Sequence, residues 1–449
     1  MGAGDGRGET KPGKRTIYRR SKPFNPGGWT NLPSLCWIGT LSLRPMSTRF
    51  LFAASLMAIA TPAIAQNVPT RTLSRPDAEF EEPFTTLQGV RELRDGRVIA
   101  VDPRDKTVQV IDFRTGTATK LGREGSGPGE YGMPMRLLAL PNDTSAVVDM
   151  LNNRMLLINP DAKVGGFVDL NVPPPAGGRG RGMMMMGASM PTASDLKGRM
   201  YVQGPPFRMT DNGPVSSDSA PIIRWNRTGG ARDTIAWLRL PAGSSQISGS
   251  GGRGNQNVRV QIGGGPPFVG ADAFAVAPDG RIAVVHHEPY SVEYISETGQ
   301  RTRGQPIRYE RVKVTEGHKQ EWRERQKSAT RMSMTVDNSG RRQATIGPAG
   351  AVQDPDTWGG EFMPPFLPNM QNVAMFSNDG FLWVQRTGPA GQPPTFDVID
   401  RGGNLVQRVV LPKRARLVGF GNNAVFTVRL DEDDLQYLQK YRFAMAERP

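Results

Sequence analysis

The chain has 449 residues, of which 56 are Lys or Arg, 42 are Asp or Glu, three are His and one, Cys36, is Cys. A single cysteine excludes an internal disulfide framework, and a chain of this length buries a large core without such cross-links. The basic residues are spread along the chain. This argues against a nucleic-acid-binding protein, in which basic residues gather in one patch.

The first recognisable segment is residues 46–65, MSTRFLFAASLMAIATPAIA, which has a basic start, an apolar run and small residues at its end. This three-part pattern is typical of a secretory signal peptide. We therefore expect cleavage near Ala65 and Gln66 and a periplasmic or secreted protein, since Gln66 stands where a lipoprotein has its cysteine. In the alternative interpretation Met1 is the true start and residues 50–65 are a weak anchor, but this apolar run is short for a membrane span.

Because signal peptides begin at the N-terminus, we expect residues 1–45 to be a disordered upstream extension that is not native to the protein. Residues 1–65 carry nine Lys and Arg and two acidic residues, so their removal lowers the formal charge from +14 to +7. It also removes Cys36, which leaves the mature chain without thiol chemistry. We expect no transmembrane span in the mature protein.

From Arg91 to Thr117 the chain reads RELRDGRVIAVDPRDKTVQVIDFRTGT, in which two alternating apolar runs meet at Asp95-Gly96. An Asp-Gly pair between such runs predicts a β-hairpin whose two central residues have positive φ. Similar turns recur five more times, at Asn142-Asp143, Lys197-Gly198, Asp279-Gly280, Asp379-Gly380 and Gly421-Asn422.

A third strand follows most of these turns, and in several repeats a fourth. Third strands are predicted at Thr107–Phe113, Arg154–Ile158, Pro221–Trp225, Ser291–Ile295, Thr395–Ile399 and Leu435–Phe443. Fourth strands are predicted at Val164–Leu170, Arg232–Leu240 and Leu405–Leu411. Repeats of about forty residues with four short strands each are typical of a β-propeller.

We therefore predict an all-β protein with a single domain over residues 66–449, a six-bladed β-propeller of four-stranded antiparallel blades. The sixth repeat lacks its outer strand. We expect an N-terminal strand near Thr70–Ser74 to supply it, which would close the ring and remove the open sheet edges.

Three insertions, at residues 173–191, 242–267 and 311–370, interrupt the repeats. The first is low in complexity, and the second is rich in Gly, Ser and Arg. The third contains the one inserted helix that we predict, from Thr315 to about Met332, with Thr315 as its cap and Glu316 in its first turn.

The most distinctive motif is Gly122–Pro134, GREGSGPGEYGMP, between the first and second repeats. Its candidate ligand-binding residues are Arg123, Glu124, Glu130 and Tyr131. The simpler interpretation is a structural brace between blades, because glycine-rich corners are first of all turns.

This loop, the six hairpins and the segment Glu361–Val384, EFMPPFLPNMQNVAMFSNDGFLWV, together resemble bacterial six-bladed β-propeller proteins of the NHL-repeat and TolB-like kind. The resemblance extends from about Phe80 to Phe443. It implies the propeller fold and no particular activity.

His286 and His287, in AVVHHEPY, are two of the three histidines, and Glu288 and Tyr290 follow them as further candidate ligand-binding residues. Neighbouring residues on a strand point to opposite faces, so we expect that the two histidines cannot bind one metal ion without distortion. Ordinary packed or rim histidines are the simpler interpretation, because a metal site needs three or four converging ligands.

Met183–Met186 and Met190 could capture a soft metal such as Cu(I), although a mobile loop is the simpler interpretation of this low-complexity run. No catalytic motif is recognisable. A lactonase-like hydrolase would hold Ca²⁺ in the channel with side chains such as Asp149, Asn152, Asn153 and Glu288.

Our leading hypothesis is an exported, non-catalytic propeller without a cofactor, which binds a peptide, glycan or protein on one ring face. The alternative is a Ca²⁺-dependent lactonase-like hydrolase or lyase with its site at the channel mouth. We expect a monomer that binds no nucleic acid. RNA binding of the NHL type is disfavoured by export.

Overall fold

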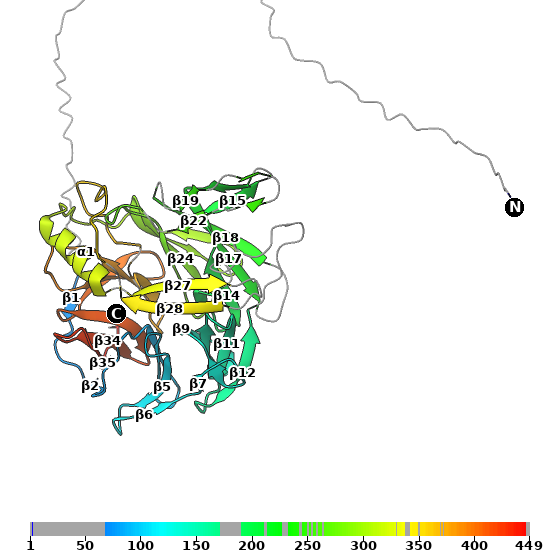
Figure 1. Ribbon diagram of the computed structural model, residues 1–449. Coiled ribbons are helices and arrows are strands. Elements are labelled where there is room, and N and C mark those ends of the chain that lie inside the picture. Colours follow the sequence, from blue (N-terminus) through cyan, green and yellow to red (C-terminus); the bar gives the residue numbers. More distant parts are fainter. Residues whose placement is uncertain are drawn as a thin grey trace, which may run out of the picture. The chain divides into compact units, whose positions relative to one another are not determined.

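The computed structural model describes Gly2 and most residues from 68 to 445 (Figure 1). Positions not described between those limits are 171–189, 211–212, 227–231, 242–244, 249–250, 253–254, 257–258, 263–264, 329, 337–341, 349–350, 369 and 371. The chain divides into two units, Met1–Ala63 and Ile64–Pro449. The predicted upstream extension, the signal peptide and the run Met183–Met186 lie outside the described residues.

The second unit is a six-bladed β-propeller, as predicted, and the strands within each blade are antiparallel neighbours in sequence order. Blade one has β3 (Gly89–Glu92), β4 (Val98–Asp102), β5 (Thr107–Asp112) and β6 (Thr117–Lys120). Blade two has β9 (Pro134–Ala139), β10 (Ser145–Asp149), β11 (Arg154–Ile158) and β12 (Val164–Asp169). Blade three has β13 (Ala193–Ser194), β14 (Arg199–Gln203), β17 (Ser219–Asn226) and β18 (Arg232–Arg239).

Blade four has β23 (Ala273–Val276), β24 (Ile282–His287), β25 (Tyr290–Ile295) and β26 (Arg301–Arg303). Blade five has β29 (Ala374–Phe376), β30 (Leu382–Arg386), β31 (Thr395–Ile399) and β32 (Leu405–Val410). Blade six has β33 (Ala415–Gly421), β34 (Ala424–Leu430) and β35 (Gln436–Arg442). The first strands contact one another around the ring: β3 lies against β33 and β9, β13 against β9 and β23, and β23 against β29.

Most hairpin turns occur where they were predicted, and at Asn142-Asp143 both residues have positive φ, of 58° and 59°, but at other turns the geometry differs. At Asp95-Gly96 only Gly96 has a positive φ, of 85°, and its N–H donates to the carbonyl of Leu93. This is a three-residue connection in which a turn is followed by a left-handed glycine, and not a two-residue turn with both φ values positive. In blade six the turn is Asn422-Asn423, one residue beyond the predicted Gly421-Asn422.

The N-terminal segment closes the ring, although not with the predicted residues. β2 (Ala78–Glu79) pairs antiparallel with β35 and completes blade six. β1 (Thr70–Thr72) instead pairs parallel with β32 as a fifth strand of blade five. The prediction that Thr70–Ser74 completes blade six was therefore wrong, because Leu73 packs into the core between blades five and six and ties β1 to the earlier sheet.

The described parts of the second and third insertions contain hairpins. A further hairpin, β15 (Phe207–Thr210) and β16 (Gly213–Ser216), which was not predicted, lies between β14 and β17. Between β18 and β23 lie β19 (Ser245–Ser248), β20 (Gly251–Gly252), β21 (Asn255–Gln256) and β22 (Arg259–Ile262). Between β26 and β29 lie α1 (Glu316–Ser328), β27 (Thr330–Val336) and β28 (Arg342–Pro348).

The helix α1 ends at Ser328, earlier than the predicted Met332, because the chain turns into β27. At its start, the Thr315 N–H donates to His318 Nδ1 at 3.1 Å, and His318 Nε2 lies 3.0 Å from the Gly388 carbonyl. His318 is buried, so this arrangement anchors the helix to blade five. No helix among the described residues has the length and apolarity needed to cross a membrane.

The core consists of separate clusters, of which six combine residues of neighbouring blades and one, around Phe268, Met363 and Leu367, packs beside α1. For example, Ile99 and Val101 of β4 pack with Val147 of β10 and Leu156 of β11. Because apolar side chains on both faces of each blade are buried in this way, the blades are held at fixed positions around the channel.

Candidate functional site

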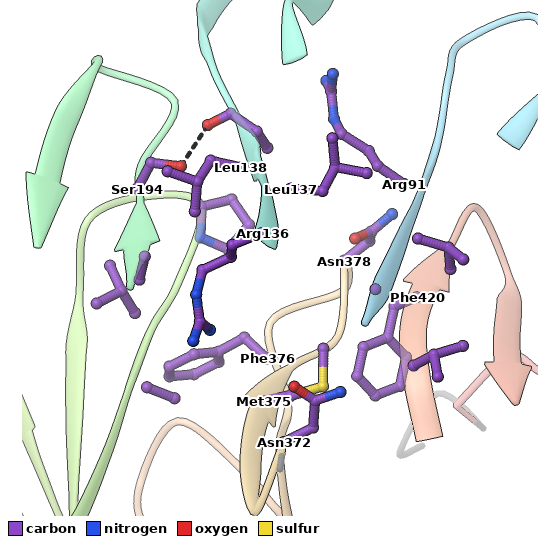
Figure 2. A pocket seen from close by; sticks show the side chains of 18 of the residues that line it. Arg91, Arg136, Leu137, Leu138, Ser194, Asn372, Met375, Phe376, Asn378 and Phe420 are labelled. Atoms are coloured by element: carbon purple, nitrogen blue, oxygen red, sulfur yellow. Dashed lines mark hydrogen bonds between the residues drawn. The ribbon is translucent and has the colours of Figure 1, made fainter. Parts of the chain in front are cut away.

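The first strands of all six blades enclose a central channel of about 1120 Å³. Its walls also include residues just before and just after these strands, so the channel runs between the two ring faces. Figure 2 shows Arg136 on β9 extending into this space, together with the hydrogen bond of 2.7 Å from Ser194 to the Ala139 carbonyl that joins blades two and three.

Three acidic side chains line the channel, and each is paired with a cation. Glu92 lies 2.6 Å from Lys440 Nζ, and Asp143 lies 2.8 Å from Arg91. Asp195 lies 2.6 Å from Arg199 Nε and accepts a hydrogen bond from the Tyr201 hydroxyl. The ion pairs of these carboxylates therefore connect neighbouring strands or neighbouring blades.

Arg136 is different, because no acidic side chain among the described residues pairs with it. It makes a long hydrogen bond of 3.5 Å from Nη1 to the Thr192 carbonyl. The side chain is accessible to solvent within the channel, while the surrounding protein removes part of its hydration and thereby lowers the pKa of Arg136.

The walls near Arg136 combine apolar side chains with amides. Phe274 comes from β23, Met375 and Phe376 come from β29, and Phe420 comes from β33. Amide groups are supplied by residues next to the inner strands, namely Asn372, Asn378 and Asn422. A concave surface that combines apolar side chains with polar groups can bind a small molecule.

None of the eight residues singled out from the sequence lines this channel. In the Gly122–Pro134 loop, Arg123 and Glu124 form β7, which pairs parallel with β8, Glu130 and Tyr131. Glu130 accepts hydrogen bonds of 2.7 Å from Arg123 and from the Gly127 N–H. Hydrogen bonds to the charged form lower the pKa of Glu130. That these residues bind a ligand stays a prediction.

The same loop is fastened to blade two by side chains of β10 and β11. The buried carboxylate of Asp149 accepts the N–H groups of Gly132 and Met133 at 3.0 and 2.9 Å. Asn152 and Arg154 donate to loop carbonyls, at Gly125 and Gly127 respectively. These contacts are those of an inter-blade brace, which was the simpler interpretation of the loop.

His286 and His287 share one partner although they are neighbours on β24. Their Nδ1 atoms each lie 3.1 Å from a different oxygen of Asp272, the residue before β23. Burial raises the pKa of Asp272, but the hydrogen bonds from the two histidines outweigh it, so the pKa lies well below its usual range. Glu288 is exposed, whereas Tyr290 is buried and donates to Asp397 at 3.1 Å.

The described residues contain no group of three His, Cys, Asp or Glu side chains that could hold a metal ion. Of the residues considered for Ca²⁺, Asp149 is occupied by backbone N–H groups, and Glu288 lies on another blade. This donor set does not fit a Ca²⁺ site, which needs six to eight converging oxygens.

Sequence reasoning missed Arg136 and the channel wall. The available signal was a single charged residue within an otherwise apolar inner strand, PMRLLA. Because a residue on an inner strand contacts either a neighbouring blade or the channel, alternation alone does not distinguish the two environments.

No protein-family model matches the sequence, and no curated protein matches it. Among solved structures, the chain is similar to a member of the DUF4221 family from Bacteroides vulgatus, with 7% identity, coverage of 81% of this chain and 94% of that chain, and a TM-score of 0.39. It is similar to a gluconolactonase from Xanthomonas campestris, with 12% identity, 81% and 91% coverage, and a TM-score of 0.36. It is also similar to virginiamycin B lyase from Staphylococcus aureus, with 10% identity, 83% and 88% coverage, and a TM-score of 0.30.

Similarity of this degree carries no argument about what the protein does. The strands and the channel by themselves define its class, a six-bladed β-propeller whose central channel contains Arg136, an arginine with no acidic partner in the described part of the chain.

Proposed function

We propose that this protein is an exported, non-catalytic propeller that binds its ligand, a peptide, glycan or protein, on the ring face that carries the insertions. We further propose that it acts as a monomer without a cofactor and is related to NHL-repeat and TolB-like propellers. The signal-peptide pattern of residues 46–65 supports export.

The observation that carries the proposal is the position of the insertions. In a four-stranded antiparallel blade, the connection from the second to the third strand lies on the same ring face as the connection from the outer strand to the next blade. The pairs β15–β16, β19–β22 and β27–β28 and the helix α1 all fall in these two kinds of connection. Extended loops on a rigid scaffold are where recognition surfaces are built.

The competing proposal is a Ca²⁺-dependent lactonase-like hydrolase or lyase. It needs carboxylates that are free to bind a metal ion or to take a proton, whereas Glu92, Asp143 and Asp195 are each held in an ion pair. The channel therefore supports binding better than hydrolysis.

The test uses purified protein beginning at Gln66. We expect no stoichiometric metal by elemental analysis and no change in melting temperature with Ca²⁺ or a chelator. On peptide and glycan arrays, replacing Thr330–Pro348 by a short Gly-Ser linker should abolish binding. A matched change on the opposite face, Arg114→Ala with Thr115→Ala, should preserve it. A tightly held stoichiometric ion, or binding that survives the linker replacement, would overturn the proposal.

A further inference from the structure

We propose that the central channel binds a small organic monoanion, whose acidic group is held by Arg136 and whose apolar body lies against the aromatic and Met side chains of blades four, five and six. This inference rests on the proposed binding function and adds to it a second, small-molecule site within the ring.

The first argument is charge. Within the channel, Arg91 is neutralised by Asp143 and Lys440 by Glu92. Arg94 also lines the channel and its side chain has no acidic partner among the described residues, but it lies in the turn after β3, whereas Arg136 lies within the inner strand β9. Arg136 is thus a cation inside the channel without an acidic partner among the described residues, so an anion is the complementary ligand.

The second argument is accessibility. The Arg136 side chain is exposed to solvent within the channel, and its hydrogen bond to the Thr192 carbonyl is long, at 3.5 Å. Its guanidinium can therefore bind a ligand without breaking a strong contact of the fold.

The third argument is the chemistry of the guanidinium. Its planar fork binds a carboxylate or sulfonate through two parallel hydrogen bonds, which a lysine cannot reproduce. Among the described channel-lining residues of the inner strands, Arg136 alone is an arginine without an acidic partner, which suits a single negative charge, whereas a doubly charged phosphate would need further cations. The ligand class is therefore a monoanion.

The fourth argument is the shape and lining of the channel. Its volume of about 1120 Å³ is at the upper end of ordinary small-molecule sites. Phe274, Phe376 and Phe420 bring aromatic surface from three blades, and Met375 adds an adaptable apolar contact. An aromatic or branched aliphatic body would bury apolar surface against these side chains.

The experiment is isothermal titration calorimetry with 3-phenylpropionate, with its uncharged amide and with benzenesulfonate. We expect wild-type protein to bind both anions more tightly than the amide. Arg136→Met should weaken anion binding roughly ten- to a hundredfold, the usual effect of losing a charged hydrogen bond, and should leave amide binding unchanged. Arg136→Lys should recover only part of the loss, and Arg114→Met, an exposed change on the turn between β5 and β6, should have no effect.

Melting curves without ligand provide a second readout. Because the Arg136 side chain is exposed within the channel and makes one long hydrogen bond, we expect Arg136→Met to melt at the wild-type temperature, which also verifies folding. The proposal is overturned if neither anion binds the wild type, if the amide binds as well as the anions, or if Arg136→Met binds anions normally. These calorimetric results test the channel site alone and do not affect the ring-face proposal. Array binding that survives replacement of Thr330–Pro348 would overturn the ring-face proposal and would not affect the channel site.

Discussion

Asp272 joins the start of β23 to the end of β24 in blade four, at the ring face that carries the insertions. Its two oxygens receive His286 and His287, and its own N–H donates to the Arg239 carbonyl of blade three. The side chain is 6% exposed, so little water is available to replace these partners. A buried carboxylate with several donors contributes to stability because each donor would otherwise be unsatisfied.

We therefore expect Asp272→Asn to lower the free energy of unfolding by about 1–3 kcal/mol at pH 7, since an amide cannot accept from both histidines with both of its terminal atoms. Urea titration of the mature protein measures this difference. The control is Asp161→Asn, at an exposed surface ion pair with Lys163, which should change stability by less than about 0.5 kcal/mol. Equal effects of the two substitutions would contradict this account of Asp272.

The same contact predicts a pH dependence. The pKa of Asp272 is lower in the folded protein than in the unfolded chain, where a carboxyl of this type titrates at about 3.9. Its contribution is therefore fully present above that pH and is lost as the pH falls below it. We expect the difference between wild type and Asp272→Asn to shrink in urea titrations below about pH 4, and a constant difference would be inconsistent with an ionised Asp272.

Among the elements, the Gly122–Pro134 loop depends on close contact between its backbone and blade two. A Cβ atom built on Gly132 would lie 2.8 Å from Leu151 Cδ2 and 2.9 Å from Leu151 Cβ. The neighbouring N–H groups are at the same time fixed by Asp149, so the loop cannot simply move away. Gly132 is thus required by packing.

Gly132→Ala should accordingly destabilise the protein by about 1–3 kcal/mol through overpacking. The matched control is Gly388→Ala, because a Cβ there meets nothing within 4 Å and Gly388 has no positive φ. Differential scanning fluorimetry followed by urea titration compares the two variants. If both melt at the wild-type temperature, the loop is not held as tightly as its contacts indicate.

Local patterns were sufficient to predict most strands but not the pairings of short polar segments. Arg154–Ile158 and Thr395–Ile399 were predicted with the bounds that the structure has, because apolar residues bounded by polar turns are a strong strand signal. Thr70-Arg71-Thr72 has no such pattern, and its partner β32 lies more than three hundred residues away in sequence. The candidate site was missed for a related reason, since only ring closure brings Arg136 near Phe376 and Phe420 in one channel.

At the scale of the whole propeller, the first and last parts of the described chain share a sheet. Besides pairing with β35, the N-terminal segment places Phe80 and Phe84, 2% and 3% exposed, in the core between blades six and one. Glu79 also pairs with Arg429 at 2.8 Å. The ring is therefore closed both by strand pairing and by burial of aromatic side chains, and opening it would require the loss of both.

Two truncations separate the roles of β1 and β2. A protein beginning at Arg75 lacks β1 and Leu73 but keeps the ring closed, so we expect a single cooperative transition at a reduced melting temperature. A protein beginning at Glu81 also loses β2 and Phe80. Losing a buried Phe alone costs about 3–5 kcal/mol, so its melting temperature should fall by roughly a further 5–15 °C.

Because the open ring exposes the edges of both terminal blades, we expect the Glu81 variant to unfold over a broader range and to aggregate. Calorimetry with circular dichroism measures both effects, and Phe80→Ala in the full mature chain separates the loss of packing from the loss of β2. If the Glu81 variant melts like the Arg75 variant, β2 does not hold the ring closed, and blade six would have to be stable with three strands.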